Sequence, residues 1–371
     1  METTQLPLLV AGLAFALAFV FGAVANRVNF CTMGAVVDIA TYGDWRRMRM
    51  WVLAIAIAVA GTGLLVATGL VDTAKSIYTL PQVRWLSCLI GGFCFGFGMT
   101  LASGCGSKTL IRAGAGNLKS VVVLLVMAIA AYMTLKGLFA VWRVNLVDPW
   151  TFDIARLGAP TSDLPSLAAA FGAPLAAKRA VPFVLAAALA IFVLKDREFR
   201  ASQEMLVGGI VIGLVIVAGW YVSGHVGYVA EDTATLEEKF FATNSGRMES
   251  FSFVSPAAYT LELLMFWSDT SRIVTFGIAG VLGMLAGSAA YALASGTFRW
   301  EGFGSVEDVG NHLAGAILMG FGGVTALGCT IGQGISGVST LAVGSFLALA
   351  AIIFGCVMAV RYQSWRMEHM A

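Results

Sequence analysis

The sequence predicts an all-α integral membrane protein with about nine transmembrane helices and additional re-entrant half-helices, arranged as an inverted repeat. Three observations lead to this fold class. The 371 residues are 58% hydrophobic and only 12% charged. Nine apolar runs are long enough, or nearly so, to cross a bilayer, which takes about 20 helical residues. A glycine-rich segment before residue 106 also recurs near the end of the chain.

Composition and charge exclude several classes of protein. Soluble domains carry about 25% charged residues, so a water-soluble enzyme is excluded. The net charge of +2 gives no basic excess, which excludes nucleic-acid binding. The six cysteines form no CxxC pair and have no histidine at metal-finger spacing. We therefore expect free thiols, no metal site, no cofactor and no catalytic group, in a chain surrounded by membrane lipid.

The predicted spans follow from the apolar runs. The run that starts at Leu6 has no Lys or Arg before it, so we interpret it as a retained helix and not as a cleavable signal. Two further apolar pieces, 29–41 and 251–267, are too weak to span and are expected to be re-entrant half-helices. The nine spans are expected at 7–27, 50–70, 86–104, 117–139, 180–195, 204–222, 272–295, 309–327 and 339–360.

Basic residues predict the orientation of the chain. With the N-terminus outside and the C-terminus inside, 13 Lys and Arg residues lie on the inner side and nine on the outer side. The segment 143–179 holds four of the eight prolines, and 224–250 is acidic. Both segments are expected to be external loops.

An internal repeat supports the inverted architecture. Residues 91–105 (GGFCFGFGMTLASGC) match residues 315–329 (GAILMGFGGVTALGC) without gaps, and seven of fifteen positions are identical. A weaker similarity links the first span to the sixth. Because one span separates the halves, they must have opposite orientations. We expect one membrane domain made of a first half, 1–140, an external loop with a connecting helix, 141–203, and a second, inverted half, 204–371.

Three cysteines stand where an apolar helix ends and a second short segment begins. They are Cys31, Cys105 and Cys329. A half-helix that begins there would present unpaired N–H groups and the positive end of its dipole, which attract anions. A neutral thiol suits an anionic sulfur ligand, whereas a thiolate suits covalent sulfur transfer, and the sequence leaves both open. Cys88, Cys94 and Cys356 lie inside apolar runs and are interpreted as small buried hydrophobes.

Polar and small residues beside these cysteines complete the candidate substrate-binding set. Lys108 could hold an anion, although a lysine at an inner helix end is equally typical of an orientation signal. Lys136, Glu262 and His312 lie near span ends, where snorkelling is as plausible as function. The remaining candidates are Thr32, Gly104, Gly106, Ser107, Gly328, Thr330 and Gln333.

These motifs resemble the YeeE/YedE family of sulfur-transport membrane proteins. The matching pieces are NFCTMGA around Cys31, GFGMTLASGCGSKT around Cys105 and GFGGVTALGCTIGQGISG around Cys329, with FSFVSP at 251–256 similar to the family's fourth half-helix. The resemblance implies thiosulfate uptake across the bacterial inner membrane, with the ion passed between these three thiols. It also implies that a small cytosolic TusA-like sulfur carrier is a possible partner.

Three hypotheses therefore compete. The first is a transporter of thiosulfate or a similar sulfur oxyanion. The second is a membrane sulfurtransferase that forms a persulfide on Cys105 or Cys329, although no nearby histidine offers a base. The third is a channel for another sulfur or selenium species, because an inverted repeat does not determine the substrate.

Overall fold

The computed structural model describes residues 5–232 and 236–370. In this part of the chain, seven helical segments are long and apolar enough to cross a membrane, and the few strands are two residues long. The protein is therefore an all-α, multi-pass membrane protein, as the sequence predicts.

Each of the nine expected spans coincides with a helix. Two of the nine do not meet the length and apolarity of a span by themselves: α9 is apolar over Arg179–Leu194, and α14 starts with a charged turn at Glu307 and Asp308. The nine helices are α1 (Leu6–Arg27), α3 (Arg46–Ala67), α4 (Trp85–Leu101), α6 (Leu118–Lys136), α9 (Leu175–Leu194), α11 (Gln203–Tyr221), α13 (Phe276–Ala294), α14 (Val306–Thr325) and α15 (Val343–Met370).

Short helices follow four of the long ones in the chain. The expected half-helices form as α2 (Thr32–Tyr42) and α12 (Val254–Met265). Two more short segments follow Cys105 and Cys329: the helix α5 (Gly106–Gly114) and a π-helical turn, Gly332–Gly337. The π-helical form of the last segment was not expected from the sequence.

The segments expected to be external loops contain ordered structure. β1 pairs with β2 in antiparallel register, with Gln82 opposite Asp153, and β3 pairs with β4, with Tyr228 opposite Phe240. We call the side of the molecule formed by 68–84, 137–174, 222–232 and 236–253 the loop face. The small elements are the 3₁₀ turns Thr73–Lys75 and Ile154–Leu157, the π turns Arg143–Val147 and Val222–Val226, α7 (Leu138–Trp142), α8 (Leu164–Ala170), α10 (Arg197–Ala201), β1 (Gln82–Val83), β2 (Phe152–Asp153), β3 (Tyr228–Val229) and β4 (Lys239–Phe240).

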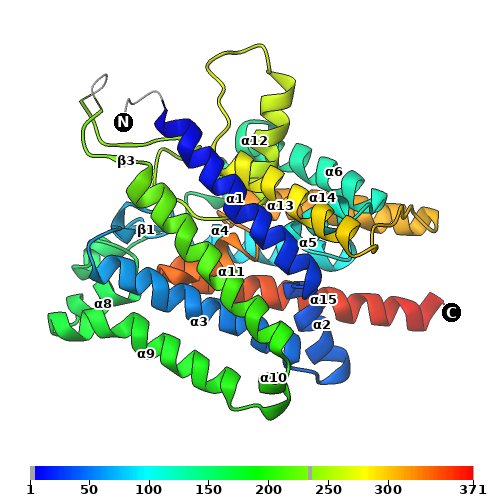
Figure 1. Cartoon of the computed structure of the whole chain (residues 1–371), viewed down its shortest axis with the longest axis horizontal. Coiled ribbons are helices and arrows are strands. Elements are labelled where there is room, and N and C mark those ends of the chain that lie inside the picture. Colours follow the sequence, from blue (N-terminus) through cyan, green and yellow to red (C-terminus); the bar gives the residue numbers. More distant parts are fainter. Residues whose placement is uncertain (1–4, 233–235, 371) are drawn as a thin grey trace.

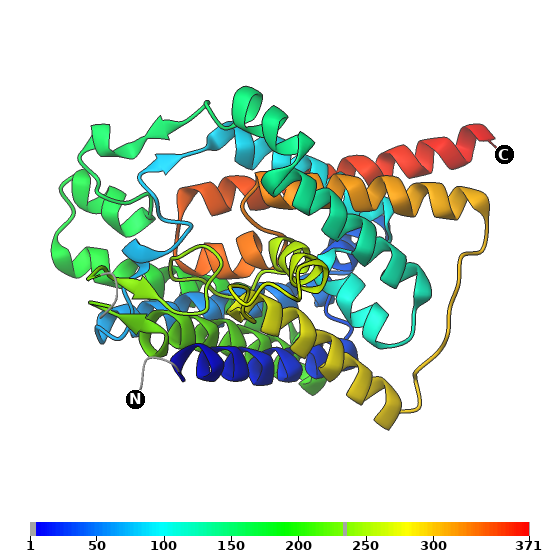
Figure 2. The same ribbon diagram turned by 90° about the horizontal axis from the view of Figure 1, so that it is seen from above.

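The long helices form two layers whose contacts are symmetric. In Figure 1, α1 and α11 run side by side and α9 lies along the edge, against α3. Figure 2 shows α14 and α15 on the side opposite α1 and α11. Helix α1 packs on α13 as α11 packs on α3, and α15 packs on α4 as α6 packs on α14. This exchange of partners is what a two-fold relation between the halves requires; the boundaries at residues 140 and 204 stay a prediction.

Glycines of the sequence repeat form the contact between α4 and α14. A Cβ atom on Gly98 would lie 2.7 Å from the Gly315 carbonyl oxygen, and one on Gly315 would lie 2.5 Å from that of Gly98. Gly91 and Gly322 have the same reciprocal relation, at 2.8 and 2.5 Å. The two backbones therefore touch directly, which only small residues permit.

Adding one methyl group at this contact should destabilise the protein. In Gly322→Ala, the new Cβ would lie 2.5 Å from the Gly91 oxygen, and backbone atoms cannot rotate away. We expect a loss of about 1–3 kcal/mol, typical of overpacking, measured as a lower melting temperature in detergent. Gly12→Ala is the control, because a Cβ at Gly12 meets nothing within 4 Å. Equal melting temperatures for the two variants would contradict this packing.

Glu249 is an acidic residue held half-buried in the loop face. Its Oε2 accepts a hydrogen bond from Ser245 Oγ at 3.1 Å, and its backbone N–H donates to Ser223 Oγ at 3.3 Å. Burial raises the pKa of the Glu249 carboxyl to about 7. The folded protein therefore keeps a proton on Glu249 between its ordinary pKa of 4.5 and about 7, where the unfolded chain has lost it.

This carboxyl should make stability fall as the pH rises through that window. The folded state binds more protons there than the unfolded state, so the free energy of unfolding decreases with pH. In Glu249→Gln this term is absent. We expect the melting temperature of the variant, relative to wild type, to rise between about pH 5 and about pH 8. A difference that does not change with pH would show that Glu249 titrates normally.

Candidate functional site

The three helix breaks that precede Cys31, Cys105 and Cys329 have the same backbone geometry. Two residues before each cysteine, a non-glycine residue takes a left-handed conformation, with φ of 52° at Asn29, 56° at Ser103 and 61° at Leu327. L-residues adopt this region at a cost of about 1–2 kcal/mol. The residue after each one donates its N–H to the carbonyl five positions back, at 2.8–2.9 Å, which closes a Schellman-type helix end. The same backbone conformation and hydrogen bond therefore end all three helices.

Cys31 caps the first turn of α2. Its Sγ accepts the backbone N–H of Gly34 at 3.3 Å, and 5% of the residue is exposed. The Arg47 guanidinium packs directly against Gly34, since a Cβ on Gly34 would lie 2.1 Å from Arg47 Nη1. The first thiol therefore lies beside both a helix N-terminus and a cation.

Cys105 precedes α5 and is fully buried. Its Sγ lies 3.3 Å from Ser107 Oγ, and the Cys31 thiol lies nearby. The Thr330 side chain, from the C-terminal part of the chain, is also close to this thiol. Residues from both parts of the chain therefore surround Cys105.

Cys329 lies at the start of the third break and is also fully buried. Its Sγ accepts the N–H of Gly332 at 3.5 Å and lies 4.0 Å from Ser252 Oγ. In the described chain, no three His, Cys, Asp or Glu side chains are placed to share a metal ion. Cys105 is close enough to interact with both Cys31 and Cys329.

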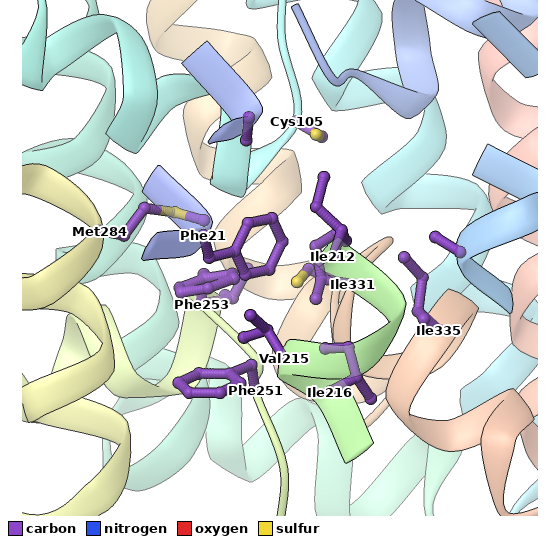
Figure 3. Close-up of a cluster of buried hydrophobic side chains, with 14 of the residues drawn as sticks. Phe21, Cys105, Ile212, Val215, Ile216, Phe251, Phe253, Met284, Ile331 and Ile335 are labelled. Carbon is purple, nitrogen blue, oxygen red and sulfur yellow. The ribbon is translucent and has the colours of Figure 1, made fainter. Parts of the chain in front are cut away.

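Apolar side chains surround Cys105. Figure 3 shows this residue at one edge of a cluster that includes Phe21, Ile212, Ile331 and Phe253. All five residues are at least 98% buried. In such surroundings a polar ligand gains more from each hydrogen bond than it would in water, so the few thiols and hydroxyls here dominate the chemistry.

A family model described as Sulphur transport matches residues 27–358. The chain belongs to this sulphur-transport family. It is 25% identical over 351 residues to Thiosulfate transporter TsuA of Escherichia coli K12, a match that covers 90% of the chain and 89% of that protein. It is 26% identical over 346 residues to Thiosulfate transporter TsuA of Spirochaeta thermophila, covering 91% of the chain and 94% of that protein. The family resemblance predicted from the cysteine motifs is confirmed.

Lys108 has a hydrogen-bond partner in the protein that the sequence did not indicate. Its Nζ donates a hydrogen bond to Asn29 Oδ1, and 7% of the residue is exposed. Arg112 Nη1 donates to the Ser103 carbonyl at 2.7 Å. These two cations therefore hold the left-handed residues of the first and second breaks.

Several of the other candidates carry polar atoms without a partner. Thr32 Oγ1, Thr330 Oγ1 and Gln333 Oε1 are buried and make no hydrogen bond in the described structure. An unpaired buried polar group costs about 1–3 kcal/mol, so these atoms are suited to a ligand. The candidate glycines differ: a Cβ on Gly328 would lie 2.9 Å from the Gln333 nitrogen, whereas Gly104 and Gly106 have no neighbour closer than 3.3 Å.

The remaining titratable candidates lie in ion pairs. Glu262 accepts from Lys136 Nζ at 2.8 Å and from Arg272 Nη1 at 3.1 Å, and His312 Nδ1 lies 3.0 Å from Asp308. Of the other cysteines, Cys88 and Cys356 are buried as expected, but Cys94 is half-exposed. The prediction of a buried Cys94 was wrong, since its side chain is partly exposed.

Two residues beside Cys329 were missed. Ser252 faces the thiol just before α12, and a Cβ on Gly332 would lie 2.6 Å from Ser252 Oγ and 3.4 Å from the Tyr78 hydroxyl. A serine directly before a half-helix was a usable signal for Ser252. Tyr78 had none, because it comes from a loop more than 250 positions away in the sequence.

Proposed function

We propose that this protein takes up thiosulfate across the bacterial inner membrane by passing the ion between buried thiols. The observation that carries the proposal is that Cys31, Cys105 and Cys329 are all buried at helix breaks of one backbone geometry, with Cys105 close enough to interact with both of the others. The names of the two relatives support thiosulfate as the substrate. The N-terminus and the loop face would lie in the periplasm and the C-terminus in the cytoplasm, in agreement with the positive-inside rule.

Neutral thiols suit this task. A thiol donates a weak hydrogen bond and offers a polarizable sulfur to the sulfur and oxygen atoms of thiosulfate. The first turn of α5 adds free N–H groups at Cys105, which stabilise negative charge. Ser107 and Thr330 supply hydroxyl donors beside the same thiol. Weak, successive sites let an ion both bind and leave, which transport requires.

Cys31 is the last thiol before the cytoplasmic side in this proposal. Lys108, which interacts with both Cys105 and Cys31, and Arg47, which lies against Gly34 at the start of α2, would attract the anion toward this thiol. A groove next to α2, lined by Trp45 and Arg46 among others, opens on this face with a volume of about 700 Å³. We propose that a small TusA-like sulfur carrier meets the protein at this groove.

Replacing the thiols tests the function. Uptake of radiolabelled thiosulfate into a bacterium without its own importers should fall at least about tenfold in Cys31→Ala, Cys105→Ala and Cys329→Ala, since each change removes about 1.4 kcal/mol or more of binding along the route. Cys94→Ala is the matched control, because this partly exposed thiol is not at any of the three helix breaks. Full uptake by the three variants would refute the thiol mechanism.

The proposal also holds that the protein moves thiosulfate without cleaving it. After incubation with thiosulfate, intact-mass measurement of the purified protein should show no gain of one sulfur atom on any cysteine. A persulfide that disappears in Cys105→Ala or Cys329→Ala would instead establish the sulfurtransferase alternative.

A further inference from the structure

A small cavity lies at the loop face, next to the helix break that precedes Cys329. It is bounded by the loop before α4, the first turns of α4 and α15, Ser162 and the break at Leu327, and its volume is about 30 Å³. Its polar lining comes from Tyr78, Gln82, Arg84, Ser162, Gln333 and Ser345. Cys31, Cys105 and Cys329 do not line this cavity, so the roles proposed for them do not explain it.

Three side chains that line the cavity have polar atoms without partners. The Tyr78 hydroxyl, Gln333 Oε1 and Ser345 Oγ make no hydrogen bond in the described structure, and the three residues are 7%, 2% and 1% exposed. Leaving a buried donor or acceptor unpaired is costly. Three such atoms around one cavity indicate a site for a polar ligand.

The surroundings of the cavity favour an anion. The N-termini of two long helices, α4 and α15, meet it, and neither has an acidic residue in its first turn. Arg84 stands directly before α4 and forms part of the wall. Its partner Asp148 is shared, at 3.6 Å from Arg84 Nη1 and 3.5 Å from Arg143 Nε, so one positive charge stays in excess. Helix N-termini and an arginine together stabilise negative charge.

Tyr78 connects this cavity with Cys329. A Cβ on Gly332 would lie 3.4 Å from the Tyr78 hydroxyl, and the Gly332 N–H donates to Cys329 Sγ at 3.5 Å. The Tyr78 ring is held edge-on against Trp220, with ring centres 6.1 Å apart, and Trp220 Nε1 is anchored on Ser339 Oγ at 2.9 Å. Burial raises the pKa of Tyr78, so its hydroxyl stays protonated and can donate.

The cavity is smaller than the ion that the site would bind. About 30 Å³ holds about two water molecules, which is less than a sulfur oxyanion needs. Binding therefore requires the wall toward the loop face to move, and that wall includes the exposed Gln82 and the partly exposed Arg84.

We propose that this cavity is an outer binding site for the sulfur oxyanion, in which Arg84, Tyr78 and Ser345 replace its hydration water before it reaches Cys329. The inference rests on the proposed function and adds to it a binding site ahead of the thiols. Gln333 Oε1, an acceptor, would hold a water molecule that stays with the ion.

Uptake kinetics test the site. Tyr78→Phe and Ser345→Ala each remove one hydroxyl without removing the bulk of the side chain, and we expect the KM for thiosulfate to rise about fivefold to tenfold, as for a lost bond to a charged ligand. The maximal rate should stay within about twofold. Tyr228→Phe is the control, because the Tyr228 hydroxyl is bonded to Lys75 Nζ at 2.7 Å on the same face, outside the cavity. An unchanged KM in both cavity variants would refute the site.

A binding measurement separates this inference from the transport mechanism. Purified Cys31→Ala/Cys105→Ala/Cys329→Ala protein, which lacks all three thiols of the route, should still gain melting temperature on addition of thiosulfate. The gain should be lost when Tyr78→Phe and Ser345→Ala are added. No gain in the protein with an intact cavity would mean that the cavity holds water only. If wild-type protein imports no thiosulfate, the proposed function fails, and this thermal shift alone decides the site.

Arg84→Gln provides a variant that does not depend on replacing a buried group. Arg84 is only partly buried, and Arg143 remains to pair with Asp148, so the protein should fold. Its KM should rise about tenfold at low salt and differ less from wild type at high salt, because salt screens the attraction of the ion. A KM equal to that of wild type at low salt would contradict the role of Arg84.

Discussion

The direct backbone contact between α4 and α14 is the constraint on which the other features depend. The reciprocal approach of Gly98 and Gly315, and of Gly91 and Gly322, holds the two helices antiparallel and in direct contact just before each of them ends. Both helices then break in the same way, and the short segments that follow approach each other, so that Thr330 of one half faces Cys105 of the other. A bulkier residue at any of the four glycines would separate the helices and with them the two breaks.

Because its interior contains few charged side chains, the protein must bind an anion there through groups that form weak hydrogen bonds. The described interior offers thiols, hydroxyls, helix N-termini and glycine-lined spaces, whereas the basic side chains lie at its two ends: Arg84 toward the loop face, and Lys108 and Arg112 beside the opposite breaks. A strongly charged site in the middle would bind a divalent anion too tightly to release it. Strain at the left-handed residues Asn29 and Leu327 is consistent with this role, because it places the breaks where a ligand needs them.

The sequence predicted much of this organisation, for physical reasons. Hydropathy located nine helices because a span must be apolar over its length, and the repeat ending in Gly-Cys located two of the breaks. What it could not predict depends on contacts between distant residues. The bond from Lys108 to Asn29, the position of Tyr78 beside Gly332 and the exposure of Cys94 are set by the packing of helices, which leaves no local pattern. The sequence did not predict the ordered structure of the loop face, because strands of two residues are too short to give a recognisable sequence pattern.

The central claim is that a sulfur anion crosses the protein along the thiols at the helix breaks. The most direct test is an experimental structure of the protein with thiosulfate, in which the two sulfur atoms of the ion are located by their anomalous scattering. The account predicts the ion beside Cys105, between its Sγ and the Thr330 hydroxyl, or at Cys329 near Ser252. An ion bound away from all three helix breaks, for example between α9 and α3 at the edge of the molecule, would contradict it.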